Sequence, residues 1–131
     1  MRTVCAIALA IFALISSPAR GAGQQENSGA APPKHTFIVI YKQGPAWPPG
    51  KTLKELPLQD HGKYILSLYS KGILKLGGPF ADETGGAAVF EAADETEAKA
   101  IIAKDPAVTS QIFVPEIHPW ALVQWEQRLK K

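Results

Sequence analysis

The segment from His35 to Lys42 (HTFIVIYK) constrains the fold more than any other part of the sequence. It is rich in β-branched and aromatic residues, and proline and glycine lie on either side of it, which predicts a β-strand. A strand with one packed face alternates apolar with polar residues. Here both faces are apolar, with Phe37, Val39 and Tyr41 on one and Ile38 and Ile40 on the other. We therefore expect a strand inside a sheet that is covered on both sides.

Residues 57–71 are predicted to form a helix. Apolar residues and one histidine recur there at spacings of three and four, so they share one face: Leu58, His61, Ile65, Leu68 and Tyr69. Gly72 follows where a C-terminal glycine cap is expected. Gly62 lies inside the helix at a cost of about 1 kcal/mol relative to alanine. We expect this glycine to permit the close approach of a neighbouring element.

A β-hairpin is predicted next, with strands at residues 73–76 and 87–91 and a turn at residues 82–86. The first of these strands runs into Gly77-Gly78-Pro79-Phe80. The last predicted strand spans residues 111–117 and contains Pro115, which demands an edge position or a bulge. Residues 123–131 are expected to form a frayed helix at the end of the chain.

The second helix is predicted to begin at Asp94. This residue is a favourable N-cap, and Glu97 stands three residues on, as in a capping box. The helix ends near Asp105, because the residue before a proline disfavours helical geometry. A short turn follows Pro106 and reaches Ser110.

The predicted order β-α-β-β-α-β is the ferredoxin-like arrangement of the α+β class, a four-stranded antiparallel sheet with two helices on one face. The first and third strands are central in that topology. Helices cover only one face of such a sheet, yet the first strand is apolar on both. A second copy of the chain is the simplest cover for the other face. We therefore expect a homodimer.

The start of the chain is predicted to be a cleavable signal peptide at residues 1–23. A short positive region precedes an unbroken apolar run from Val4 to Ile15, and small residues follow it. Cleavage after Ala19, Gly21 or Gly23 fits equally well. The run is shorter than the roughly 20 residues that span a bilayer. We expect an exported protein, periplasmic or secreted, with a flexible linker at residues 24–34 and one domain at residues 35–122.

The remaining composition excludes several classes of function. Cys5 is the only cysteine and lies inside the predicted signal, which leaves no thiol for catalysis, disulfides or zinc. Two of the 14 basic residues also lie in the signal, so 12 basic residues remain against 12 acidic ones. This balance is unlike the basic surface of a nucleic-acid-binding protein. Three histidines without regular spacing make no metal site, and no cofactor is expected.

The ordered features of residues 35–122 resemble the YCII-related (YciI-like) family of the dimeric α+β barrel superfamily. They are His61 in the first helix, Gly72 at its end, Gly77-Gly78-Pro79-Phe80, Asp105-Pro106 and Pro119-Trp120. The resemblance implies a ferredoxin-like fold, a homodimer and an active site that includes His61 and Asp105. Relatives in the wider superfamily include isomerases, dehalogenating lyases and cofactor-free oxygenases, and others bind haem. The proline-rich loop at residues 43–52 departs from the simplest members.

The chemistry of a histidine and an aspartate agrees with that implication. Histidine can take and give a proton at neutral pH. An aspartate bonded to one ring nitrogen fixes the tautomer and stabilises the imidazolium. Two structural alternatives stay open: His61 as a core histidine on the apolar stripe of its helix, and Asp105 as a simple N-cap with proline at the first helical position.

The candidate substrate-binding residues are Tyr41, Trp47, Gly78 and Pro79. The backbone of a Gly77-Gly78 turn can be approached closely and can offer N–H donors to an oxyanion. Trp47, in the loop at residues 43–52, is either a lid over a cleft or a plug at the edge of the core, and the plug is favoured. Tyr64 and Phe80 are further candidates for an apolar pocket.

The leading hypothesis is a small-molecule enzyme of the proton-transfer lyase or isomerase type, with His61 as base or acid and Asp105 as its orienting partner. The alternative is a non-catalytic periplasmic module that binds a small ligand in the same cleft. A purely structural dimer is a third possibility, and an exposed apolar patch outside the dimer interface would be its first sign.

Overall fold

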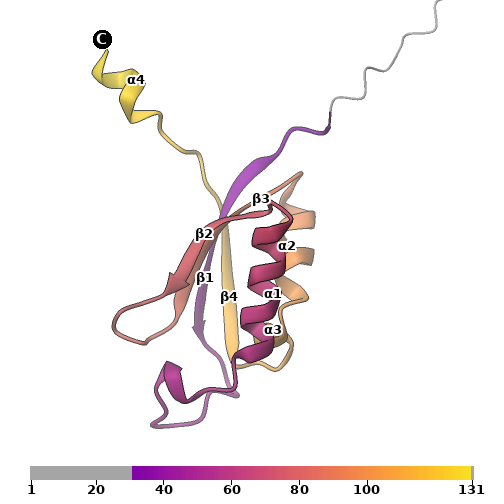
Figure 1. Cartoon of the computed structure of the whole chain (residues 1–131), viewed down its shortest axis with the longest axis vertical. Coiled ribbons are helices and arrows are strands. Elements are labelled where there is room, and N and C mark those ends of the chain that lie inside the picture. Colours follow the sequence, from indigo (N-terminus) through magenta and orange to yellow (C-terminus); the bar gives the residue numbers. More distant parts are fainter. Residues whose placement is uncertain (1–30, 131) are drawn as a thin grey trace, which may run out of the picture. The chain divides into compact units, whose positions relative to one another are not determined.

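The computed structural model describes residues 31–130, and the predicted signal peptide at residues 1–23 lies outside the described residues. The described elements follow the predicted order (Figure 1). They are β1 (His35–Gln43), η1 (Leu53–Glu55), α1 (Gln59–Ser70), β2 (Leu74–Pro79), β3 (Gly86–Ala92), α2 (Glu95–Ala103), α3 (Pro106–Thr109), β4 (Phe113–Pro119) and α4 (Trp125–Leu129).

The four strands form one antiparallel sheet in the order β2-β3-β1-β4. The first and third strands are central, as predicted, and α1 and α2 lie on the same side of the sheet (Figure 1). Pro115 lies in β4, an edge strand, where its missing N–H interrupts no ladder on the outer side. The α+β ferredoxin-like fold class is therefore confirmed.

The core lies between the sheet and the helices. The buried side chains of β1 are Phe37, Val39 and Tyr41, as expected for the face that meets α1 and α2. Phe37 stacks on Phe90 of β3 with ring centroids 5.9 Å apart. The buried residues Leu68 of α1 and Ile102 of α2 belong to the same apolar cluster.

The opposite face of the sheet is not covered within the described chain. Ile38 and Ile40 of β1 are only partly buried there. Across the ladders they pair with Val89 and Ala87 of β3 and with His118 and Glu116 of β4. On the same face, Leu76 of β2 pairs with Val89 and is 64 % exposed. One chain thus leaves open a sheet face that is apolar along β1 and carries Lys42, Glu116 and His118 toward β4. This is the face that the sequence analysis expects a second copy to cover.

The local capping predictions are confirmed, with one change in detail. Gly72 follows α1 with φ at +70°, the left-handed conformation that glycine adopts readily. Asp94 caps α2 by accepting the Glu97 N–H at 2.8 Å. The Glu97 carboxylate reaches back to the N–H of Ala93 instead of that of Asp94.

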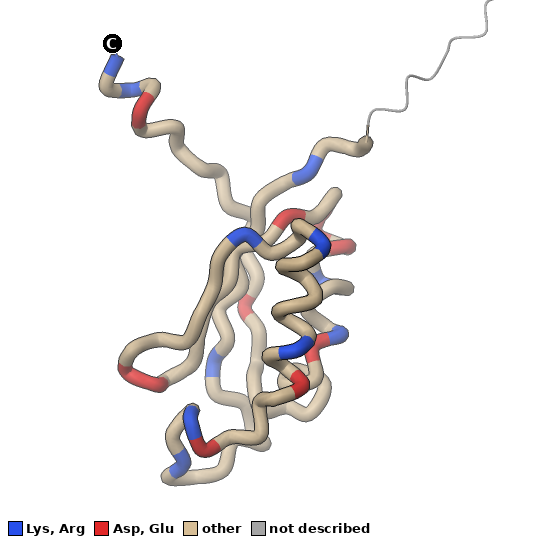
Figure 2. Tube along the Cα trace, in the orientation of Figure 1, with Lys and Arg blue, Asp and Glu red and all other residues tan. Residues whose placement is uncertain are grey.

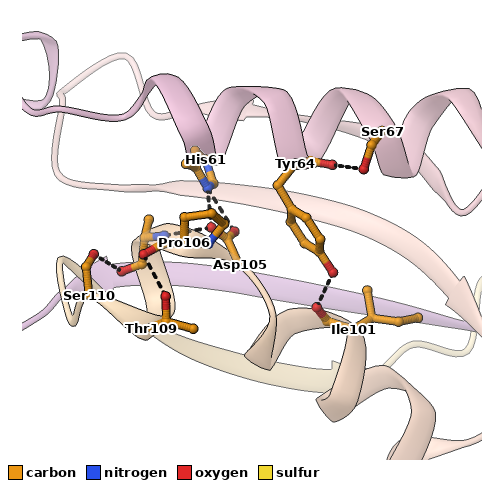
Figure 3. Close-up of polar contacts among 9 residues, drawn as sticks. His61, Tyr64, Ser67, Ile101, Asp105, Pro106, Thr109 and Ser110 are labelled. Atoms are coloured by element: carbon orange, nitrogen blue, oxygen red, sulfur yellow. Dashed lines mark hydrogen bonds and ion pairs between the residues drawn. The ribbon is translucent and has the colours of Figure 1, made fainter.

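Two details of the helices and strands differ from the prediction. Tyr69 does not face the core and is 60 % exposed, because the inward face of α1 continues through Leu68 instead. Tyr64 takes an inward place and donates its hydroxyl to the Ile101 carbonyl at 2.6 Å, which ties α1 to α2 (Figure 3). Strand β2 extends to Pro79, so Gly77 and Gly78 belong to a paired strand and not to a turn.

Charged residues of both signs are interspersed along the described chain, without a long stretch of one sign (Figure 2). Within residues 31–130, no helix is long and apolar enough to cross a membrane.

Candidate active site around His61 and Asp105

Asp105 lies between the end of α2 and the start of α3, and its side chain is fully buried. Its Oδ1 accepts the backbone N–H of Ala107 at 2.9 Å, which makes it the N-cap of α3. Pro106 occupies the first helical position, where its missing N–H is of no consequence. The chain therefore turns sharply after α2 and holds this carboxylate inside the protein.

His61 meets that carboxylate from α1, 44 residues earlier in the sequence (Figure 3). Its Nδ1 lies 2.9 Å from Oδ1 and 2.8 Å from Oδ2 of Asp105. Because a carboxylate can only accept, Nδ1 carries the proton in this contact. The N-cap role of Asp105 and its contact with His61 therefore occur together, and neither excludes the other.

The second ring nitrogen of His61 is left for other partners. Within residues 31–130, Nε2 pairs with no protein donor or acceptor, and the side chain is 19 % exposed. With the proton on Nδ1, Nε2 of the neutral ring carries a lone pair. A buried core histidine would have both nitrogens satisfied by the protein. His61 instead presents one free nitrogen beside a cavity.

This cavity has a volume of about 280 Å³ and lies between α1 and the sheet. Carbon atoms dominate its surface. Among the lining side chains, His61 and Tyr41 are the ionisable ones. The lining residues are Tyr41, Leu53, Leu58, His61, Gly62, Ile65, Gly77, Gly78, Pro79, Gly85, Gly86, Ala87, Ala88 and Phe113.

Tyr41 contributes its ring to the cavity and keeps its hydroxyl hidden. The ring meets the edge of the His61 imidazole at 5.4 Å between centroids. The hydroxyl is buried and has no hydrogen-bond partner among the described residues. Burial and the nearby Asp105 carboxylate raise the pKa of Tyr41 well above its usual range. The phenol therefore stays protonated, and Tyr41 cannot serve as a base at neutral pH.

Three glycines around the cavity are needed because a side chain at their positions would collide with neighbouring protein atoms. A Cβ on Gly77 would lie 2.9 Å from the Ala88 Cβ, and one on Gly86 would lie 2.8 Å from the Gly78 carbonyl oxygen. Gly85 has φ at +155°, and a Cβ there would lie 2.1 Å from the Tyr41 carbonyl oxygen. Close strand packing and the hairpin turn account for these glycines.

Gly62 is different, and the expectation of close approach at this position is wrong. A Cβ built on Gly62 would meet nothing within 4 Å outside its own helix. The residue lines the cavity directly after His61. No neighbouring element uses the space that its missing side chain leaves.

The structure places the four predicted substrate-binding residues in two locations. Tyr41, Gly78 and Pro79 line the cavity, whereas Trp47 does not. Trp47 is buried against Phe113, with ring centroids 5.9 Å apart, and its indole N–H donates to the Lys51 carbonyl at 3.0 Å. It therefore lies as a plug at the edge of the core, the alternative that the sequence favours over a lid.

Other residues singled out in the sequence also lie away from the cavity. Tyr64 and Phe80 are not among its lining residues. The exposed His118 pairs through Nε2 with Glu116 at 2.8 Å. In the part of the chain that the structure describes, no group of three or more His, Cys, Asp or Glu side chains is placed to hold a metal ion.

Sequence reasoning missed Leu53 and Phe113 as cavity residues. Ile65 was recognisable because it shares the helical stripe of His61. Leu53 lies in the short η1 after a proline-rich loop, and no periodic pattern marks it. Its neighbour Lys54 forms an ion pair with Glu83 of the hairpin loop at 2.6 Å, which joins the two segments that carry Leu53 and Gly85.

Comparisons with known proteins agree with this architecture. The family model of the YCII-related domain matches residues 37–121, which is more than half of the chain. No curated protein matches the sequence. Among solved structures, 5-chloro-2-hydroxyhydroquinone dehydrochlorinase (TftG) from Burkholderia phenoliruptrix AC1100, in complex with 2,5-dihydroxybenzoquinone, is similar with a TM-score of 0.50 and 20% identity. That match covers 68% of this chain and 97% of the other, and it shows a shared fold.

Proposed function

This chain belongs to the YCII-related domain family, and we propose that it is a small-molecule enzyme of the proton-transfer lyase or isomerase type. His61 is the base or acid, Asp105 is its orienting partner, and no cofactor takes part. The ligand occupies the cavity between α1 and the sheet, where Tyr41, Gly78 and Pro79 form part of the wall.

The observation that carries this proposal is the position of the two nitrogens of His61. A fully buried carboxylate holds Nδ1, while Nε2 has no protein partner within residues 31–130. An aspartate in this position stabilises the imidazolium that forms when Nε2 takes a proton. The apolar surroundings strengthen that electrostatic contact relative to water. The arrangement supports proton transfer at Nε2.

The cavity supports a small ring as the ligand. An apolar cavity of about 150 Å³ can hold one benzene molecule, so 280 Å³ leaves room for a ring with a few substituents. The structural relative is a dehydrochlorinase whose complex contains 2,5-dihydroxybenzoquinone. We therefore propose hydroxylated or quinonoid single rings as the first compounds to test.

The proposed reaction begins when Nε2 removes a proton from a hydroxyl group or from a carbon next to a carbonyl. The electron pair left behind forms a new C=O or C=C bond. In a lyase, a carbon deprotonated next to a carbonyl forms a C=C bond as the leaving group departs from the adjacent carbon with its bonding pair. Deprotonation of an enol hydroxyl instead forms C=O and shifts the existing C=C bond by one position, so the leaving group departs, with its bonding pair, from the carbon beyond that bond. In an isomerase, the imidazolium returns the proton to another carbon of the same ring. Asp105 stabilises the imidazolium through its contact with Nδ1.

Chloride release from 5-chloro-2-hydroxyhydroquinone, together with isomerisation of related enols and enones, tests the proposal. We expect wild-type turnover and its loss by at least about 100-fold in His61→Asn, with an unchanged far-UV circular dichroism spectrum. His118→Asn is the matched control, because His118 is exposed, lies outside the cavity and pairs with Glu116, and it should retain activity. Turnover that survives in His61→Asn contradicts the proposal. Ring binding without turnover in wild type favours the ligand-binding module instead.

We also propose that the chain forms a homodimer and is exported. The open apolar sheet face around Ile38 and Ile40 supports the dimer. The apolar run from Val4 to Ile15, followed by small residues, supports export to the periplasm or the medium. N-terminal sequencing of the protein expressed in a Gram-negative bacterium tests export. Cleavage between residues 19 and 24 is expected, and an intact N-terminus contradicts it.

A further inference from the structure

Gly62 is a glycine that the fold does not require. It lies in the middle of α1, where glycine costs about 1 kcal/mol relative to alanine. Its backbone is helical, so it does not need the left-handed conformation that explains Gly72 and Gly85. Nothing outside its own helix lies within 4 Å of the Cβ position. Neither backbone conformation nor packing therefore accounts for it.

The other glycines of the cavity wall do have structural reasons. Gly77 and Gly86 avoid collisions with β3 and β2, and Gly85 combines a positive φ with a collision. Gly78 also has open space at its Cβ position. Its partner in the ladder is Ala87, however, and strand alternation places that Cβ on the face opposite to the buried Ala88. A side chain on Gly78 would therefore leave the sheet away from α1.

Gly62 thus combines two properties that no other glycine of the cavity wall has together. It lines the cavity next to the catalytic candidate His61, and the space at its Cβ position is empty. Gly62 is exposed and also lines the cavity, so it lies where the cavity opens to solvent. A methyl group there would meet no protein atom outside the helix and would project at this opening. A stabilising alanine is compatible with the fold at this position, yet the chain has glycine.

We propose that Gly62 is a specificity-determining residue, whose missing side chain sets the size of the ring that the cavity admits beside His61. This inference rests on the proposed function only in placing the ligand in this cavity. It predicts opposite effects of one substitution: alanine at position 62 makes the domain more stable and the accepted ligands smaller.

The experiment compares the wild-type protein with Gly62→Ala and Gly62→Leu. The probes are phenol, 4-methylphenol and 4-tert-butylphenol, which differ in size and keep one hydroxyl group. Binding is measured by calorimetry and by NMR shifts, and stability by thermal unfolding. Ser70→Ala is the matched control, because Ser70 is an exposed residue near the end of the same helix, outside the cavity.

Gly62→Ala should raise the Tm by about 4–8 °C and weaken the largest bound phenol at least about tenfold. Phenol itself should bind within about threefold of wild type. Gly62→Leu should remain folded and bind none of the three. Ser70→Ala should leave all three affinities unchanged, because it changes helix propensity without touching the cavity.

Three results would overturn the inference: wild-type protein that binds no phenol, Gly62→Ala that binds all three with wild-type affinity, or Gly62→Ala with a lowered Tm. The failure of the proposed function has a different signature. If Gly62→Ala sorts the phenols by size while no substrate is turned over, the inference stands and the enzyme proposal falls. If turnover depends on His61 but Gly62→Ala does not discriminate between the phenols by size, the enzyme proposal stands and the inference about Gly62 falls.

Discussion

At the scale of single residues, Asp105 combines two duties that are often separate. Its carboxylate caps α3 through the Ala107 N–H and holds Nδ1 of His61. An acid after the last turn of α2 is unfavourable for the dipole of that helix. The start of α3 supplies a donor that offsets this cost. The cap needs only an acceptor oxygen, whereas stabilising the imidazolium needs a negative charge, so substitutions can separate the two roles.

Asp105→Ala should lower the free energy of unfolding by about 1–3 kcal/mol, because it removes the cap and leaves Nδ1 of a half-buried histidine without a partner. Asp105→Asn should recover part of that loss, since asparagine is an equally good N-cap. Activity should stay lost in both, because an amide does not stabilise the imidazolium. Urea unfolding and turnover measured side by side test this. Full activity in Asp105→Asn would show that Asp105 is only a cap.

Tyr41 is the second residue with an unusual environment, since its hydroxyl is buried without a hydrogen-bond partner among the described residues. Its pKa is raised in the folded state, by burial first and by Asp105 second. The unfolded tyrosine ionises from about pH 10. The stability linked to this group is therefore complete below about pH 10 and is lost as the pH rises toward the higher folded value.

Tyr41→Phe should consequently flatten the loss of stability above pH 10. At neutral pH it should be neutral or raise the free energy of unfolding by about 1 kcal/mol, because it removes an unsatisfied buried hydroxyl and keeps the ring. Denaturant unfolding at pH 7 and at pH 10.5 measures both effects. A loss of stability at pH 7 would mean that the hydroxyl has a partner in solution.

At the scale of elements, the sequence predicts what local chemistry determines. The caps of α1 and α2 follow from Gly72 and Asp94, and the edge position of β4 follows from Pro115. The roles of the glycines do not follow from local patterns. Gly77 and Gly62 look alike in sequence, but one avoids a collision across a ladder and the other borders a cavity. That difference depends on which element packs opposite each glycine.

Two glycines of the cavity wall should therefore respond in opposite ways to alanine. Gly85→Ala should lower the free energy of unfolding by about 2–4 kcal/mol, because the Cβ would lie 2.1 Å from the Tyr41 carbonyl oxygen at φ +155°. Chemical denaturation compares it with Gly62→Ala, for which a gain is expected. Equal stabilities for the two variants would contradict the structural distinction.

At the scale of the whole molecule, the order of the predicted elements gives the sheet topology, and the two-faced pattern of β1 predicts the open sheet face. It predicts less of the active site. His61 and Asp105 are marked by family resemblance and by chemistry, and the fold brings them together across 44 residues. The place of Leu53 in the cavity wall depends on how the loop before α1 packs against the core. The inward position of Tyr64 depends in the same way on the last turn of α2. No periodicity encodes those contacts.

The dimer proposal makes a prediction at this scale. Ile40 lies on the open sheet face beside Ala87 of β3 and Glu116 of β4. Ile40→Arg should convert a dimer into a monomer, because a charge buried in an apolar interface is costly. Leu66→Arg is the control on the outer side of α1, where the side chain is 63 % exposed. Light scattering over a range of concentrations gives the masses. A dimeric Ile40→Arg variant would place the interface elsewhere.

Proton transfer at Nε2 requires one tautomer of His61, which long-range ¹H–¹⁵N NMR spectra of the domain reveal directly. We expect the neutral ring to carry its proton on Nδ1 and the Nε2 atom to bear a lone pair, and we expect the Nε2 signal to shift when a phenol fills the cavity. In Asp105→Asn the preference for the Nδ1–H tautomer should weaken. A neutral His61 with its proton on Nε2 in the wild-type protein, or an Nε2 signal that does not change at saturating ligand, would rule out Nε2 as the proton-transfer atom.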